Sequence, residues 1–179
     1  MTKILGLSGS LRKASFNSAL LRAASNLTPS SAEIVIGSLD AVPLYNGDVE
    51  DETGLPDAVK TLQTQLAGAD ALLLVTPEYN SGIPGVFKNT LDWMSRGNGG
   101  ALFKGKPTAV IGASPGGFGT VLSQGHWLPT LRALGTRPWY EGRLAVAHAD
   151  QKFDAQGQLT DAKTRDALRD YLAGFVATL

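Results

Sequence analysis

The chain has 179 residues, of which 43% are hydrophobic and 18% are charged, and its 21 glycines are typical of one compact α/β domain. Lys and Arg together number 16, as do Asp and Glu, so the sequence offers no basic field for nucleic acid or an anionic membrane. Cysteine is absent, which excludes disulfides, thiolate metal sites and cysteine nucleophiles. Because neither a leader peptide nor a membrane-spanning apolar run is evident, we expect a soluble cytoplasmic protein that forms a single domain over residues 1–179.

Short apolar runs alternate with helical patterns along the whole chain. They predict strands over residues 4–7, 33–37, 69–75 and 108–112, and a fifth over 143–147, alone or with 137–140. Helical spacing predicts helices over 18–26, 56–67, 86–95, 120–134 and 161–179, the last with Thr160 as its N-cap. This alternation predicts an α/β fold, a flavodoxin-like three-layer sandwich. Its five-stranded parallel sheet would have the order 2-1-3-4-5, with helices on both faces.

The segment from Ser8 to Ser18 joins the first predicted strand to the first predicted helix. At such a junction backbone N–H groups lack partners and the helix dipole favours an anion. Serines and an asparagine add neutral donors, and the guanidinium of Arg12 suits a phosphate. We therefore predict a phosphate cradle; the alternative is a plain helix N-cap, for which Asn17 or Ser18 would serve. No G-x-x-x-x-G-K-S/T sequence is present and no G-x-G-x-x-G follows a strand, which excludes a P-loop and a dinucleotide-binding turn.

Two further loops are expected beside this one, because ligands of such sheets bind where the strand order switches, outside the carboxyl ends of the strands. Residues 76–85, after the third strand, contain Tyr79 between two prolines, and residues 113–120, after the fourth, are rich in glycine and contain Phe118. An aromatic, glycine-rich platform beside a phosphate cradle suits a planar aromatic ligand with one phosphate, and FMN fits best. For each loop taken alone, the alternative is a turn or helix start without a ligand.

Three motifs of the chain resemble the NADPH-dependent FMN reductase family, which includes bacterial quinone, chromate and azo reductases. They are Gly9-Ser10-Leu11-Arg12-x-x-Ser15-x-Asn17, then Thr76-Pro77-Glu78-Tyr79-Asn80 continuing through Pro84-Gly85-x-x-Lys88-Asn89-x-x-Asp92-Trp93, and Ser114-Pro115-Gly116-Gly117. The resemblance implies that the FMN phosphate is held by the first motif, at Ser10, Arg12, Ser15 and Asn17, with Phe16 alongside. It implies that the isoalloxazine ring lies against Pro77, Glu78, Tyr79 and Asn80, with Ser114, Gly116 and Gly117 on the far side.

The same resemblance implies an enzyme that passes hydride from NADPH or NADH through FMN to a small-molecule acceptor. Quinones, free flavins, chromate and azo compounds are the expected acceptor classes. With one open face of the ring, nicotinamide and acceptor would take turns in a ping-pong cycle that needs no catalytic side chain and no metal. The alternative is a flavodoxin-type electron carrier, which the neutral charge and Arg12 disfavour. A phosphoacceptor receiver domain would need acidic residues where this chain has Ser8 and Ser10.

The helix predicted over residues 86–95 carries four large apolar residues, Phe87, Leu91, Trp93 and Met94. This is more than one sheet-facing stripe needs, so we expect part of it to meet a second subunit in a homodimer or homotetramer. The alternative is that all four side chains reach the core of their own chain. Chromate and quinone reductases of the family often carry an arginine where this chain has Val121-Leu122, which leaves dimer and tetramer open. His126 and His148 are expected to be packed or surface histidines rather than metal ligands.

Overall fold

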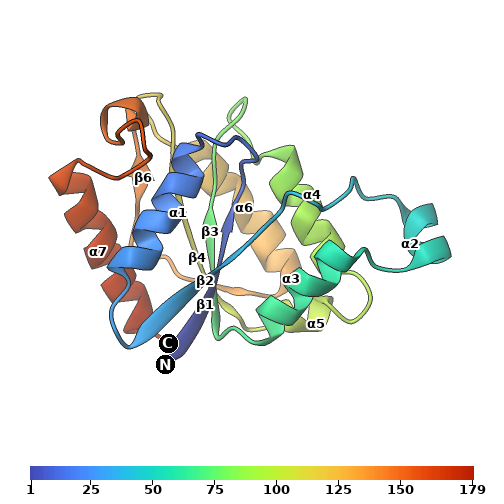
Figure 1. Cartoon of the computed structure of the whole chain (residues 1–179). Helices are drawn as coiled ribbons and strands as arrows, with labels where there is room; N and C mark the ends of the chain where they lie inside the picture. The colour runs from blue at the N-terminus through green and yellow to red at the C-terminus, as the bar shows by residue number, and fades with distance from the viewer.

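A parallel sheet in the order β2-β1-β3-β4-β5 forms the centre of the molecule in the computed structural model, which describes all residues from Met1 to Leu179 (Figure 1). The strands are β1 (Thr2–Ser8), β2 (Ala32–Gly37), β3 (Ala71–Val75), β4 (Pro107–Ala113), β5 (Arg137–Pro138) and β6 (Ala145–Val146). The helices are α1 (Phe16–Leu27), α2 (Gly47–Thr53), α3 (Asp57–Ala67), α4 (Gly85–Met94), α5 (Gly100–Phe103), α6 (Val121–Leu134) and α7 (Ala162–Val176), with a 3-10 turn at Ala149–Gln151. The predicted strand order is confirmed.

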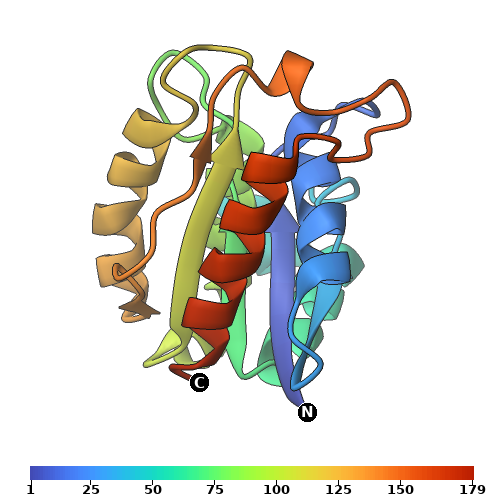
Figure 2. The ribbon, with the colours of Figure 1, turned by 90° about the vertical axis from the view of Figure 1, so that its left-hand side faces the viewer.

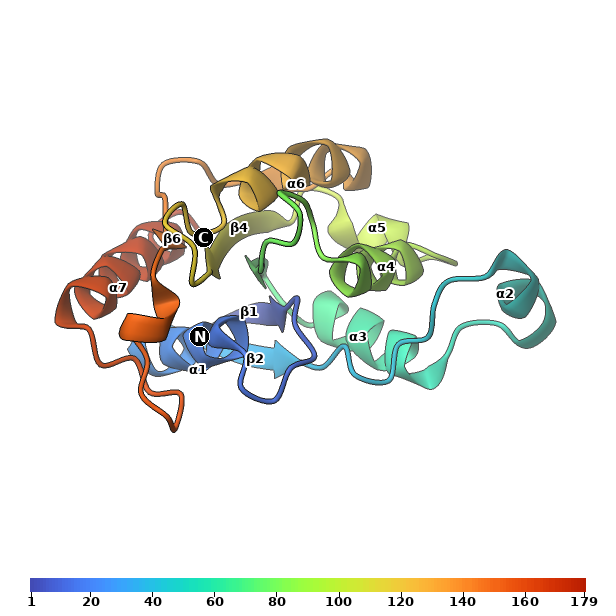
Figure 3. The same ribbon diagram turned by 90° about the horizontal axis from the view of Figure 1, so that it is seen from above.

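Two hydrophobic cores, one on each face of the sheet, hold the layers together. Helices α1 and α7 cover one face, and α3, α4 and α6 cover the other (Figure 3). Neighbouring residues of β3 alternate between the two cores: Leu72 and Leu74 enter one, and Leu73 and Val75 enter the other. This alternation explains why the central strands are continuously apolar, since both faces of each strand are buried.

The fifth strand position is occupied by two short segments rather than one strand. β5 pairs with the start of β4, where Thr108 lies beside Pro138, and β6 pairs with its end, where Ala113 lies beside Val146. Both predicted segments therefore contribute. Proline has no N–H to donate to a ladder, and the chain leaves the sheet after Pro138 before it returns at β6.

The helix starts differ from the predictions where a cap was assigned to the wrong residue. α1 begins at Phe16 because Ser15 is its N-cap, with its Oγ accepting from the Ser18 N–H at 3.2 Å. α7 is capped by Asp161 instead of Thr160: the Asp161 carboxylate accepts from the Thr164 N–H at 2.8 Å. Two hydrogen bonds lower the pKa of Asp161 because they stabilise its charged carboxylate. The larger effect comes from the Thr164 hydroxyl and the next from the Thr164 N–H.

Helices α2 and α5 have no counterpart in the predicted elements. α2 has seven residues and no buried side chain, so the sequence carries no apolar stripe that would reveal it. It lies on a segment that projects from the body of the molecule (Figures 1 and 3). Asn89 and Trp93 of α4 tie this segment down, since both donate to the carbonyl of Pro43, at 2.8 and 3.0 Å.

All four large apolar residues of α4 are buried in their own chain. Phe87, Leu91, Trp93 and Met94 each have 0% of their surface exposed. The expectation that part of this set meets a second subunit is therefore wrong. Phe87, Leu91 and Met94 belong to the core on this face of the sheet. The projecting segment covers the fourth residue, because Tyr45 packs edge-on against the ring of Trp93, with the ring centroids 4.8 Å apart.

The loops at the carboxyl ends of the strands lie together at the top of the molecule, whereas both termini lie at the opposite edge (Figure 2). None of the helices has the length and apolar character needed to cross a membrane.

Candidate functional site

The loops after β1, β3 and β4 meet at one edge of the sheet. The register places Ser8 of β1 beside Val75 of β3, and Val75 beside Ile111 of β4, so the strands end nearly level. The loops also touch: a Cβ atom at Gly9 would lie 3.0 Å from Cδ of Pro77. Seen from above, they surround one area of the edge (Figure 3). This is the place where the strand order puts a ligand site.

The loop after β1 presents free hydrogen-bond donors at the start of α1. The N–H groups of Phe16 and Asn17, in the first turn of the helix, have no partner in the chain. Ser10 lies in the same loop, and its hydroxyl oxygen accepts from the Arg12 N–H at 3.4 Å. The Arg12 side chain is exposed and makes no ion pair. These groups fit a phosphate monoester, which needs converging N–H donors and a cation.

A cavity of about 610 Å³ opens beside this end of α1. Arg12, Lys13 and Ser15 line one side of it, and residues of the 150–157 segment line the other. Phe16 is part of the same wall, and its ring lies 5.8 Å from the ring of Phe153, centroid to centroid. The cavity thus has cations on its α1 side and an aromatic wall.

Two of the predicted phosphate ligands are already engaged within the chain. The Ser15 oxygen caps α1, so neither Asn17 nor Ser18 has that role. The Asn17 side chain is 3% exposed and faces the end of β4. Its Nδ2 donates to the Ala113 carbonyl and its Oδ1 accepts from the Ala113 N–H, both at 2.9 Å. Asn17 therefore presents its backbone N–H to the cradle, while its amide group holds the neighbouring loop.

The loop after β3 is a tight hairpin with an exposed aromatic ring. Tyr79 and Gly82 exchange two backbone hydrogen bonds, at 2.9 and 3.3 Å, around a turn made by Asn80 and Ser81. Both turn residues have positive φ, 49° for Asn80 and 62° for Ser81, as a two-residue hairpin loop with a type I′ turn requires. Tyr79 is 51% exposed, so its ring offers a flat apolar surface, whereas the predicted ring contact Pro77 is buried.

Glu78, in the same loop, points toward the helix that follows β4. Its Oε2 accepts from the N–H groups of Leu122 and Ser123, each at 3.0 Å, and so caps the N-terminus of α6 from outside that helix. A buried contact lies behind it, because the hydroxyls of Thr76 and Ser123 are 3.0 Å apart. This carboxylate is therefore a partner of α6, a role that the sequence gives no local sign of.

The loop after β4 leaves its backbone accessible. The Ser114 Oγ accepts from the Gly116 N–H at 3.1 Å, while the N–H groups of Gly117 and Phe118 have no partner in the chain. The Phe118 side chain is 85% exposed. His148 packs beside this loop: a Cβ atom at Gly117 would lie 3.6 Å from its Cε1. Free N–H groups and exposed rings are suited to one edge and one face of a planar heterocycle.

Backbone strain is concentrated at this edge of the molecule. Asn80, Ser81 and His148 are the only residues other than glycine with positive φ, and all three lie in loops that border the candidate site. Such conformations cost on the order of 1–3 kcal/mol each and cluster at ligand sites. His126 and His148 are both exposed, as expected for surface histidines.

The family model of the NADPH-dependent FMN reductases matches residues 2–151. The chain belongs to this family. Membership makes it an oxidoreductase that uses FMN with NAD(P)H, as the motifs predicted.

Relatives and solved structures agree with this assignment. An NAD(P)H-dependent FMN reductase of Pseudomonas aeruginosa is 44% identical over 170 residues, 95% of this chain and 91% of the relative. A 2-hydroxy-1,4-benzoquinone reductase of a Burkholderia species is 36% identical over 175 residues, 98% and 94% of the two chains. FerB, a flavoenzyme NAD(P)H:(acceptor) oxidoreductase of Paracoccus denitrificans, has a structure that superposes with a TM-score of 0.88 at 33% identity, covering 99% of this chain and 96% of that one.

Proposed function

We propose that this FMN reductase transfers a hydride from NAD(P)H to a quinone by a ping-pong mechanism. The similarity to the benzoquinone reductase of Burkholderia supports quinones as the acceptor class. Free flavins, chromate and azo compounds are the other acceptors to be compared. Bound FMN supplies the redox chemistry, since it takes up two electrons as hydride and releases them to an acceptor.

The observation that carries the proposal is the cradle at the start of α1. The free N–H groups of Phe16 and Asn17 point a partial positive charge at an anion, and Arg12 adds a full one. The hydroxyls of Ser10 and Ser15 can each donate one further hydrogen bond. A single phosphate satisfies this set of donors.

The ring of the cofactor would lie between the loops after β3 and β4. Tyr79 provides the exposed apolar surface on one side, and Pro77, which is buried, supports the hairpin from below, with Glu78 and Asn80 holding that hairpin. Ser114, Gly116 and Gly117 form the other side, where free N–H groups can bind the polar edge of the ring. A ring held in this way has one open face, so nicotinamide and acceptor must occupy it in turn.

Steady-state kinetics of the FMN-loaded enzyme test this mechanism. NADPH consumption is measured while NADPH and 1,4-benzoquinone are each varied at several fixed concentrations of the other. We expect parallel double-reciprocal lines; intersecting lines would show a ternary complex and overturn the shared face. Intact FMN binding without any NADPH oxidation would favour the electron-carrier alternative. FMN should also bind more tightly than FAD, and equal or tighter binding of FAD would contradict a cradle built for one phosphate.

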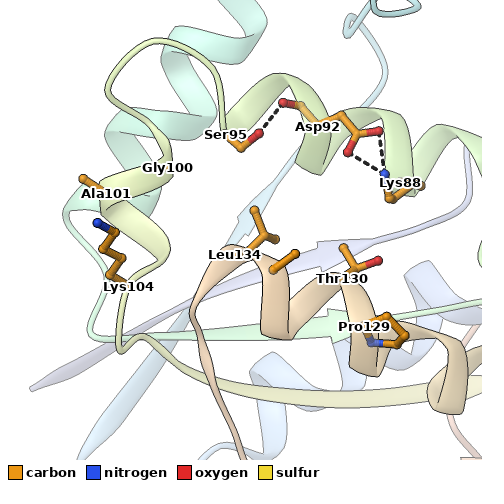
Figure 4. Close-up of a pocket in the computed structure, with 10 residues that line it drawn as sticks. Lys88, Asp92, Ser95, Gly100, Ala101, Lys104, Pro129, Thr130 and Leu134 are labelled. Carbon is orange, nitrogen blue, oxygen red and sulfur yellow. Dashed lines mark hydrogen bonds and ion pairs between the residues drawn. The ribbon is translucent and has the colours of Figure 1, made fainter.

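We also propose that the enzyme self-associates, through α6 rather than α4. Val121, Leu122 and Leu128 of α6 are 50%, 51% and 45% exposed, an unusual amount of open apolar surface for one helix. A groove of about 710 Å³ lies along one side of α6, between this helix and α4 and α5 (Figure 4). Another, of about 780 Å³, lies on its other side, next to Tyr140. The two grooves share Pro129 and Ala133 as their border, and Leu128 lines the second one. A second copy that packs against this face of α6 around a two-fold axis would cover exposed apolar side chains of both chains.

This face is continuous with the cofactor site. α6 starts directly after the loop of Gly116 and Gly117, and Glu78 holds its first turn. A second copy on α6 would therefore border the open face of the ring. Leu122 occupies part of this contact in place of the arginine common in related reductases, so an apolar contact replaces a charged one.

A further inference from the structure

We propose that Asn17 and Glu78 are positioning residues, whose side chains lock the phosphate-binding loop and the ring-binding loops into one rigid site before the cofactor binds. The proposal rests on the proposed function, because it concerns how the FMN site is assembled. It departs from the family resemblance, which places both residues in contact with FMN.

Asn17 connects the start of α1 to the end of β4. Both polar atoms of its amide are bound to one residue, Ala113, through two hydrogen bonds of 2.9 Å across 96 positions of the chain. Asn17 is 3% exposed. Its two hydrogen bonds take the place of strand pairing on the β3 side of Ala113, because the pairing of β3 with β4 ends at Ile111. The loop of Ser114 begins at the next residue. The amide thus sets the separation between the phosphate cradle and the far wall of the ring site.

Glu78 makes the corresponding connection between the loops after β3 and β4. Its Oε2 receives two N–H groups at the N-terminus of α6, a charge-assisted contact in which the helix dipole favours the carboxylate. The hairpin carrying Tyr79 starts at the next residue and contains two strained positions. A hairpin with strained backbone needs external contacts to stay in one conformation, and Glu78 provides them.

The two contacts act in series. Asn17 joins the first loop to the third, and Glu78 joins the second to the helix that follows the third. Both contacts are made by groups of the chain alone, so we expect them to form before flavin binds. Pre-organisation of this kind strengthens binding of every part of the ligand, because the ordering cost is met during folding.

The test compares FMN with riboflavin, which has the same ring and no phosphate. A phosphate ligand strengthens only FMN, whereas a positioning residue strengthens both. For Asn17→Ala and Glu78→Ala we expect the dissociation constants of FMN and riboflavin to rise by the same factor, on the order of tenfold. Glu78→Gln keeps an acceptor oxygen and should recover most of the affinity. Arg12→Ala, the control for phosphate contact, should weaken FMN and leave riboflavin unchanged.

A second control separates positioning from general destabilisation. Leu66 is fully buried on α3, in the core on the other side of the sheet from Asn17 and Ala113, so Leu66→Ala should lower the melting temperature and leave both flavin affinities unchanged. Loss of FMN affinity alone in Asn17→Ala would make Asn17 a phosphate ligand and overturn its assignment. Unchanged flavin affinity in Glu78→Ala, with only a lower melting temperature, would reduce Glu78 to a structural cap.

Hydrogen exchange of the flavin-free protein provides a readout that does not depend on turnover. The amides of Ala113, Leu122 and Ser123 should be protected in the wild type without FMN. Ala113 should lose protection in Asn17→Ala, and Leu122 and Ser123 should lose it in Glu78→Ala. Protection that appears only after FMN is added would show that the cofactor assembles the site. Because no NADPH is present in these measurements, either result leaves the proposed reaction to be judged by its own kinetics.

Discussion

Replacement of Arg12 by alanine tests the phosphate cradle most directly. The guanidinium is exposed and makes no ion pair, so its loss should change the free energy of unfolding by no more than about 0.5 kcal/mol. In the complex it would form a charge-assisted hydrogen bond to phosphate, which contributes about 1.5–3 kcal/mol. Since about 1.4 kcal/mol corresponds to a tenfold change, the FMN dissociation constant should rise roughly 10- to 150-fold.

The assay is titration of flavin-free protein with FMN, followed by the quenching of flavin fluorescence. Lys13→Ala is the matched control, because Lys13 is the adjacent exposed cation and lines the same cavity. Without a directed hydrogen bond it should contribute only a screened charge, about 0–1 kcal/mol, so the change should stay below about fivefold. Once FMN saturates the Arg12→Ala enzyme, hydride transfer should be close to that of the wild type.

Two results would refute this reasoning. An unchanged FMN dissociation constant in Arg12→Ala would place the guanidinium on the solvated surface, outside the cradle. Equal losses in Arg12→Ala and Lys13→Ala that disappear at high salt would indicate a diffuse field instead of a specific contact.

Three further predictions concern assembly, packing and pH. Leu122→Asp should shift the mass measured by light scattering toward that of one 18.8 kDa chain. Val49→Asp, at an exposed apolar position of α2, is the control and should leave the mass unchanged. A wild-type mass equal to that of one chain would refute the α6 contact. Gly112→Ala should lower the free energy of unfolding by about 1–3 kcal/mol in a urea titration, because a Cβ there would overlap the Thr76 carbonyl. Gly85→Ala, which has open space around it, is the control. Equal urea midpoints for the two variants would contradict the clash. Burial raises the pKa of Tyr171, whose hydroxyl donates to the Val110 carbonyl at 3.2 Å, so the wild type should lose stability as the pH rises above about 10, where the unfolded tyrosine ionises. Tyr171→Phe should cost about 0.5–1.5 kcal/mol at neutral pH and lack this alkaline loss; parallel stability curves for the two proteins would show that the phenol does not titrate as argued.

The strands of the sheet, their order and the long helices that cover them could be predicted from the sequence because their causes are local, whereas the short helices α2 and α5 could not. A run such as Leu72-Leu73-Leu74-Val75 reads as a strand buried on both faces, and the structure places its residues alternately in two cores. The alternation of strands with helices then leaves few topologies, and the position of the loops follows from the strand order. Short-range motifs in those loops were sufficient to identify the family.

Only the tertiary structure decided what individual side chains do in those loops. The sequence marks Asn17 and Glu78 as polar residues in a ligand loop, but their partners lie 96 and more than 40 positions away. Likewise, the apolar residues of α4 suggested an open face, but three of them enter the core, and the projecting segment covers the fourth, Trp93. On α6 the apolar side chains stay exposed because no segment covers them. Periodicity reports which side chains are apolar and where elements begin, whereas burial and hydrogen-bond partners depend on which distant segment arrives beside each residue.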